Sequence, residues 1–115
     1  MGAAEIMKAR LRADLKAAMQ NKRAVEMKTL RMLLGAIDNA EAVPVEQPRT
    51  YVTHAFGAGT AEVARRNLSD EDLQALLARE IASRRATAEE MTRLGRPDRA
   101  EPLTVEAAII AQYLR

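Results

Sequence analysis

Lys28-Thr29-Leu30-Arg31-Met32-Leu33-Leu34-Gly35-Ala36-Ile37-Asp38-Asn39-Ala40-Glu41 is the stretch that decides the fold, because it predicts the helix around which the other helices pack. At helical spacing, its apolar side chains form two neighbouring sectors: Met27, Leu30, Leu34 and Ile37 in one, and Val25, Met32, Leu33 and Ala36 in the other. An apolar surface this broad is typical of a helix that has partners on more than one side. The stretch therefore predicts the central helix of a helical core.

Composition supports an all-α protein. The chain has 115 residues, only 3% aromatic residues and no cysteine, and it is rich in strong helix formers. This length predicts a single domain over residues 1–115. Without cysteine, neither disulfides nor thiolate metal sites can hold the fold, which fits a cytoplasmic protein. The apolar runs are far shorter than the roughly 20 residues of a membrane span, and the start lacks the pattern of a signal peptide, so no membrane association is expected.

Four main helices are expected. The first spans about residues 4–21, and the central helix continues after the turn Asn21-Lys22-Arg23 to about residue 42. Ser69 and Asp72 form a capping-box pattern that predicts the start of a long third helix, which should end at Gly95. Because proline disrupts helices, Pro97 and Pro102 should bracket a short break, and Thr104 should cap the last helix. We expect a compact bundle in which the central helix lies between the first and the long third helix.

Residues 43–67 predict a long loop between the second and third helices. Pro44 and Pro48 end the central helix, and a connection this long in a compact domain is often functional. Candidate partner-binding residues in it are Tyr51, His54 and Phe56. For His54, an ordinary loop histidine is the favoured interpretation, because no base, nucleophile or metal partner can be identified for it.

The sequence contains no recognisable catalytic constellation. A single histidine and no cysteine exclude a Cys/His pair and any multi-histidine metal site. The acidic run at residues 70–72 is explained as the start of a helix, and the glycines at 57 and 59 lack the rest of a nucleotide-binding motif. We therefore predict no cofactor, no metal and no enzyme activity for the chain on its own.

Basic residues give the candidate nucleic-acid contacts: Lys28, Arg31, Arg65, Arg66, Arg84 and Arg85. Such residues can follow a phosphate backbone, with Tyr51 or Phe56 available for base stacking. The other interpretation is dispersed surface charge balanced by the 16 acidic residues, and the residues alone favour it. A basic line on the first helix, Lys8, Arg12 and Lys16, is likewise interpreted as a solvated face.

Four motifs, in order along the chain, resemble the GatB/YqeY domain family. Residues 30–41 are similar to the family's central-helix signature Leu-Arg-Met-Leu-x-x-Ala-Ile-x-Asn-x-Glu. Residues 68–72 resemble its entry to the long helix, residues 95–98 its Gly-Arg-x-Asp turn, and residues 113–114 its Tyr-Leu pair. From the residues given, we expect the small second helical subdomain common in the family to be absent and residues 43–67 to form a longer insertion than its compact linker.

The resemblance implies an all-helical domain related to the tail of the B subunit of the tRNA-dependent amidotransferase. That enzyme is a carbon–nitrogen ligase with glutamine as amido donor, and its catalytic groups belong to other domains. The resemblance thus implies a non-catalytic accessory domain whose partner is tRNA or the aminoacyl-tRNA amidotransferase. The alternative is a helical protein-interaction adaptor without RNA binding, and the oligomeric state is left open.

Overall fold

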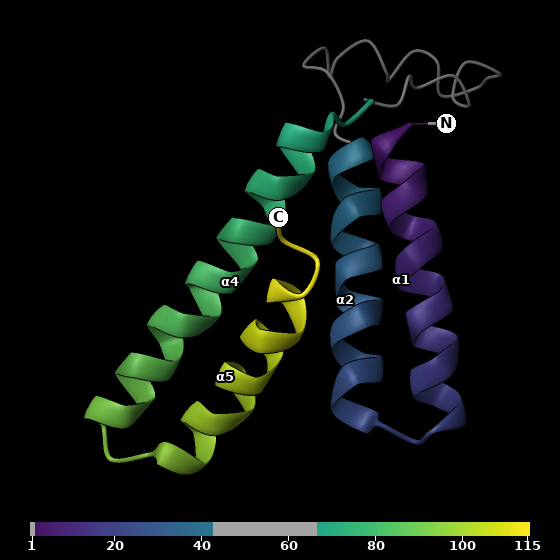
Figure 1. Ribbon diagram of the computed structural model, residues 1–115. Coiled ribbons are helices and arrows are strands. Elements are labelled where there is room, and N and C mark those ends of the chain that lie inside the picture. Colours follow the sequence, from purple (N-terminus) through teal and green to yellow (C-terminus); the bar gives the residue numbers. More distant parts are fainter. Residues whose placement is uncertain (1, 43–66) are drawn as a thin grey trace, which may run out of the picture.

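The computed structural model describes residues 2–42 and 67–115, which form four helices and contain no β-strand (Figure 1). The helices are α1 (Ala3–Gln20), α2 (Ala24–Glu41), α4 (Asp70–Arg93) and α5 (Pro97–Ala111). This confirms the all-α bundle of four main helices. None of the described helices is long and apolar enough to cross a membrane. The expectations for Tyr51, His54, Phe56, Arg65 and Arg66 fall outside the described residues.

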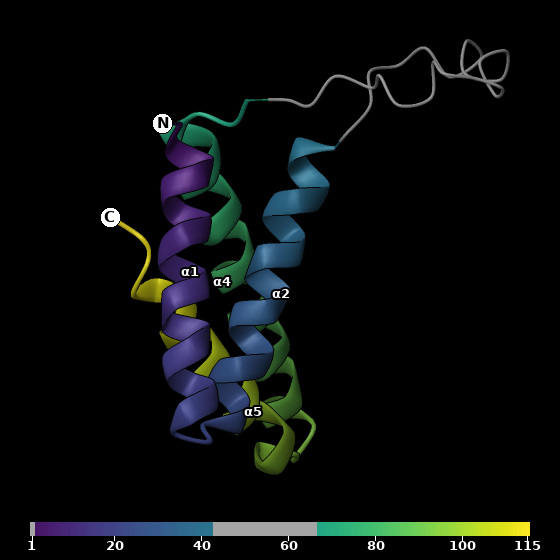
Figure 2. The same cartoon turned by 90° about the vertical axis from the view of Figure 1, so that its right-hand side faces the viewer.

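The helices form two antiparallel hairpins, α1 with α2 and α4 with α5 (Figures 1 and 2). The turn after α4 has the two hydrogen bonds of a Schellman motif, from the Arg96 N–H to the Met91 carbonyl and from the Gly95 N–H to the Thr92 carbonyl. Gly95 has a φ of 76°, the left-handed conformation that glycine adopts without strain. The end of the long helix near Gly95 is therefore confirmed.

The turn after α1 uses the same hydrogen-bond pattern with lysine in place of glycine. The Arg23 N–H donates to the Ala18 carbonyl and the Lys22 N–H to the Met19 carbonyl, while Lys22 has a φ of 55°. The expected turn at residues 21–23 is confirmed. A left-handed lysine is uncommon, so the sequence carried no signal for this geometry.

The start of α4 is the predicted capping box. The Asp72 N–H donates to Ser69 Oγ at 3.0 Å, and the Ser69 N–H donates to Asp72 Oδ2 at 3.0 Å. Three acidic residues occupy the first turn of the helix, where they lie near its positive end. Both observations explain why the sequence located this boundary.

The expectation for the last helix is wrong. No break separates Pro97 from Pro102, because α5 begins at Pro97 and continues through Pro102. Thr104 does not cap a helix, and its hydroxyl donates instead to the Ala100 carbonyl one turn earlier at 3.2 Å. Proline fits the first helical position, and burial of Ala107 and Ile110 in the core offsets the cost of Pro102 inside the helix.

The neighbours of α2 also differ from the prediction. Its main backbone neighbours are α1 and α5, whereas α4 packs chiefly against α5 and approaches α1. The prediction that α2 lies between the first helix and the long third helix is thus wrong. The reason is that α5 is a continuous helix and packs against α2.

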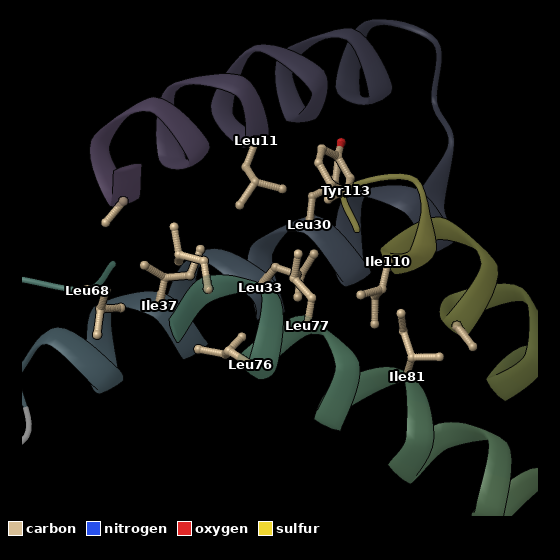
Figure 3. Close-up of a cluster of buried hydrophobic side chains, with 13 residues drawn as sticks. Leu11, Leu30, Leu33, Ile37, Leu68, Leu76, Leu77, Ile81, Ile110 and Tyr113 are labelled. Atoms are coloured by element: carbon tan, nitrogen blue, oxygen red, sulfur yellow. The ribbon is translucent and has the colours of Figure 1, made fainter. Parts of the chain in front are cut away.

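The core joins both hairpins. Leu11, Leu33 and Leu77 come from three helices and meet in its interior (Figure 3). The largest fully buried side chains are Leu11, Thr29, Leu30, Leu33, Ile37, Leu73, Leu77 and Ile110. On α2, Leu30, Leu33 and Ile37 are completely buried, and the other residues of the two apolar sectors are partly buried except Val25. The central helix of the core is therefore the one that the opening stretch predicted.

Candidate nucleic-acid interface

Lys28 and Arg31 lie one turn apart on the exposed edge of α2, whose opposite side is fixed by the buried Leu30 and Leu33. The side chain of Lys28 is 76% exposed, and its Nζ lies 3.4 Å from Oε2 of Glu106 on α5. Arg31 is exposed and forms no ion pair with any residue in 2–42 or 67–115. Arg31 is thus a cation that no carboxylate of the described fold neutralises.

Arg84 and Arg85 are adjacent in sequence, but their side chains have different surroundings. Arg84 lies at the edge of the core, and its side chain is only 16% exposed. Its Nε donates to Glu106 Oε1 at 2.9 Å, and its Nη1 donates to Glu80 Oε1 at 2.7 Å and to the Glu80 carbonyl at 3.2 Å. Arg84 is one of the candidate nucleic-acid contacts from the sequence, and in the described structure two carboxylates hold its guanidinium within the fold.

The pKa of Arg84 reflects this environment. Burial is the largest single influence and would lower the pKa of the guanidinium, but the hydrogen bonds to Glu80 and Glu106 and the charges of both carboxylates together raise it. Arg84 therefore keeps its charge while its donors are used inside the protein. Its role in the described structure is to join α4 to α5.

Arg85 is exposed and is not part of this network. It lines an open groove of about 490 Å³ between α4 and α5, together with Glu89, Arg93 and Thr104. Arginine is a suitable partner for a phosphate, whereas the Glu89 carboxylate opposes one. Arg85 is thus accessible to a polyanion, although at a different position from the edge of α2.

The basic line predicted on α1 is split. Arg12 and Lys16 are exposed, but Lys8 turns toward α2, and its side chain is only 12% exposed. Its Nζ lies 2.7 Å from Glu41 Oε1 and 3.3 Å from Asp38 Oδ1. The hydrogen bond to Glu41 is the main cause that raises the pKa of the Lys8 ammonium, against the opposing effect of burial. Lys8 therefore stabilises the α1–α2 hairpin, and the interpretation as a solvated face holds only for the other two residues.

Tyr113 forms a contact between the hairpins that no pattern in the sequence predicts. Its hydroxyl donates to the carboxylate of Asp14 on α1, and the guanidinium of Arg10 lies 4.4 Å from the centre of its ring. Arg10 also donates from Nη2 to the Gln112 carbonyl at 3.3 Å. Burial first, and then the hydrogen bond to Asp14, raises the pKa of the Tyr113 hydroxyl. Tyr113 therefore holds the end of α5 against α1.

The free energy of unfolding should fall as the pH rises above about 10. Folding raises the pKa values of Tyr113 and Lys8, so their stabilising contribution is complete below the ordinary values of the unfolded chain and is lost above them. Each group contributes a slope of up to about 1.4 kcal/mol per pH unit. Urea unfolding at several pH values between about 8 and 11 measures this loss. Tyr113→Phe should make the decline shallower, and an identical decline in both proteins would contradict the assignment to Tyr113.

No group of three or more potential metal-ligating side chains occurs among the residues that the structure describes.

The turn motif at residues 95–98 forms a local ion pair, in which Arg96 donates from Nε and Nη2 to the two carboxylate oxygens of Asp98 at 3.1 and 3.0 Å. These hydrogen bonds hold the pKa of the exposed Asp98 carboxyl below its ordinary value. The motif thus stabilises the turn between α4 and α5.

Comparison with known proteins agrees with these motifs. The sequence model of a family described as Yqey-like protein matches residues 51–115, which is more than half of the chain. The matched range contains the capping box, the turn at residues 95–98 and Tyr113, while α2 precedes it. Comparisons with curated proteins and with solved structures give no match. The chain belongs to the family of YqeY-like proteins.

Proposed function

We propose that this chain is a non-catalytic accessory domain that binds tRNA and works beside a tRNA-dependent amidotransferase. Membership of the YqeY-like family supports the proposal, since the resemblance to the tail of the amidotransferase B subunit implies a tRNA-related role. Ligation of carbon to nitrogen, with glutamine as amido donor, would then belong to other components of that complex. We also propose a cytoplasmic location, which agrees with the absence of cysteine from the chain.

The observation that carries the proposal is the pair of exposed cations on α2. Lys28 and Arg31 are one helical turn apart, so they can contact phosphates of one backbone. Arg85 adds a cation on α4, and Arg65 and Arg66 remain proposed contacts from the sequence. Arg84, which has two carboxylate partners, is assigned the supporting role of holding Glu106.

Binding of a labelled tRNA transcript should therefore depend strongly on salt. If Lys28, Arg31 and Arg85 each contact one phosphate, affinity should fall by about 40-fold between roughly 50 and 200 mM monovalent salt. Lys28→Ala and Arg31→Ala should each reduce the slope of log affinity against log salt by about 1. Fluorescence anisotropy titrations of the wild type and both variants measure these slopes.

Lys16→Ala is the matched control, because it removes an exposed cation from α1, outside the proposed contacts. It should leave the salt slope close to that of the wild type. If the protein does not bind the tRNA transcript at low salt, or if its affinity does not change with salt concentration, the proposed function is rejected and the protein-interaction adaptor is favoured.

One observation favours that alternative. A groove of about 480 Å³ at the N-terminal end of α1 is lined by Ile6, Met7, Gln74 and Tyr113 among others, and Ile6 is 57% exposed. Gln74 Nε2 is buried there and has no hydrogen-bond partner in the described fold. The groove is also lined by the charged residues Arg10, Asp70 and Arg115, and such a mixture of apolar and polar side chains is suited to a polypeptide segment. The tRNA titration separates the two functions, because the adaptor does not require salt-dependent RNA binding.

A further inference from the structure

The Glu106 carboxylate is shared by cations from two other helices. Its Oε1 accepts from Arg84 Nε on α4 at 2.9 Å, and its Oε2 lies 3.4 Å from Lys28 Nζ on α2. The Glu106 side chain is only 10% exposed. One buried carboxylate therefore links a cation at the edge of the core to a cation of the proposed tRNA interface.

The two ion pairs differ in strength. Arg84 and Glu106 are both largely buried, and their separation is in the range of a strong charge-assisted hydrogen bond. Lys28 is 76% exposed, and its separation from Glu106 is longer than that range. Lys28 can therefore leave Glu106 at little cost, because Arg84 still satisfies the carboxylate.

We propose that Glu106 sets the affinity of the α2 edge for phosphodiesters by competing with the RNA backbone for Lys28. The inference rests on the proposed function and adds its regulation. The Glu106 carboxylate and an RNA phosphate are both negatively charged, so both attract the Lys28 ammonium. An incoming phosphate must therefore separate Lys28 from Glu106, and it is then repelled by the nearby carboxylate. Arg84 is the positioning residue, because it holds the carboxylate where Lys28 can reach it.

Glu106→Gln tests the competition. The glutamine carbonyl can still accept from Arg84, but the negative charge beside Lys28 is lost. The variant should bind the tRNA transcript about two- to fivefold more tightly at roughly 100 mM salt. Glu101→Gln is the matched control, because it removes from the same helix an exposed carboxylate that forms no ion pair within residues 2–42 and 67–115. That control should change the affinity less than twofold, by about the effect of one screened charge.

A double-mutant cycle assigns the effect to Lys28. In a Lys28→Ala background, Glu106→Gln should give no more gain than Glu101→Gln. A full gain in that background would overturn the proposal, because the effect would then be general repulsion. Equal gains from the two glutamine substitutions in wild-type protein would also overturn it. In both cases the wild type still binds tRNA with a salt slope, whereas failure of the proposed function removes binding altogether.

An NMR titration of the wild-type protein covers the case in which Glu106→Gln fails to fold. When the tRNA transcript is added at low salt, the Lys28 Nζ signal should shift, while the Arg84 Nε signal should keep its position. This pattern is expected because only the exposed partner leaves the carboxylate. A large shift of Arg84 with none at Lys28 would overturn the proposal.

Discussion

Leu33→Ala should lower the free energy of unfolding by about 2–5 kcal/mol. Leu33 is completely buried on α2 and belongs to the core cluster formed by residues of both hairpins (Figure 3). Removing its side chain takes apolar surface out of the core and leaves a cavity that rigid helices cannot fill completely. Urea unfolding followed by circular dichroism measures the change as a lower midpoint with an unchanged m-value.

Leu94→Ala is the matched control for this substitution. Leu94 lies in the turn after α4 and is 62% exposed. The same change in chemistry should there alter the free energy of unfolding by less than about 0.5 kcal/mol. Similar losses for the two leucines would contradict the position of Leu33 in the core.

Arg84→Ala should lower the free energy of unfolding by about 1–3 kcal/mol. It removes donors to Glu106 and Glu80, and among the described residues Glu106 is then left with the exposed ammonium of Lys28. The expected loss is smaller than that for a completely buried pair, because water reaches part of the Arg84 side chain. Thermal and urea unfolding both measure it.

The neighbouring residue supplies the control for Arg84. Arg85→Ala removes the same type of side chain one position later on α4, where it is exposed and outside the network, and should change the free energy of unfolding by less than about 0.5 kcal/mol. Combining Arg84→Ala with Glu106→Gln should restore part of the loss, because the uncompensated charge is removed. Equal effects of the two arginine substitutions would contradict the role assigned to Arg84.

The sequence predicted those parts of the fold that depend on local interactions. Ser69 and Asp72 lie within one turn, and Gly95 acts through its own backbone conformation, so the ends of α4 could be read from neighbouring residues. The start of α5 could not, because the helix tolerates Pro102 through packing contributed by distant residues. The same reason explains why α4 was wrongly predicted as a neighbour of α2. The neighbour in the structure is α5, and the sequence predicted a last helix that began only after Pro102.

The candidate site shows the same limit. The sequence marked Arg84 only as a candidate phosphate contact, because its partner Glu106 is 22 residues away along the chain. Tyr113 and Asp14 are separated by 99 residues, and no sequence pattern connects them. Spacing along one helix thus predicts which face a side chain occupies, and only the packing of helices determines which cations have a carboxylate partner.

Lys8 has a consequence for the electrostatics of α2. The last turn of that helix contains no basic residue, and Asp38 and Glu41 add negative charge near the carbonyl end of its macrodipole, which is already negative. The ammonium of Lys8 is supplied by α1 and lies within 3.3 Å of a carboxylate oxygen of each residue. Docking of α1 therefore offsets negative charge at the end of α2, which couples the two helices of the first hairpin and lets the Lys8 charge act in place of a helix cap.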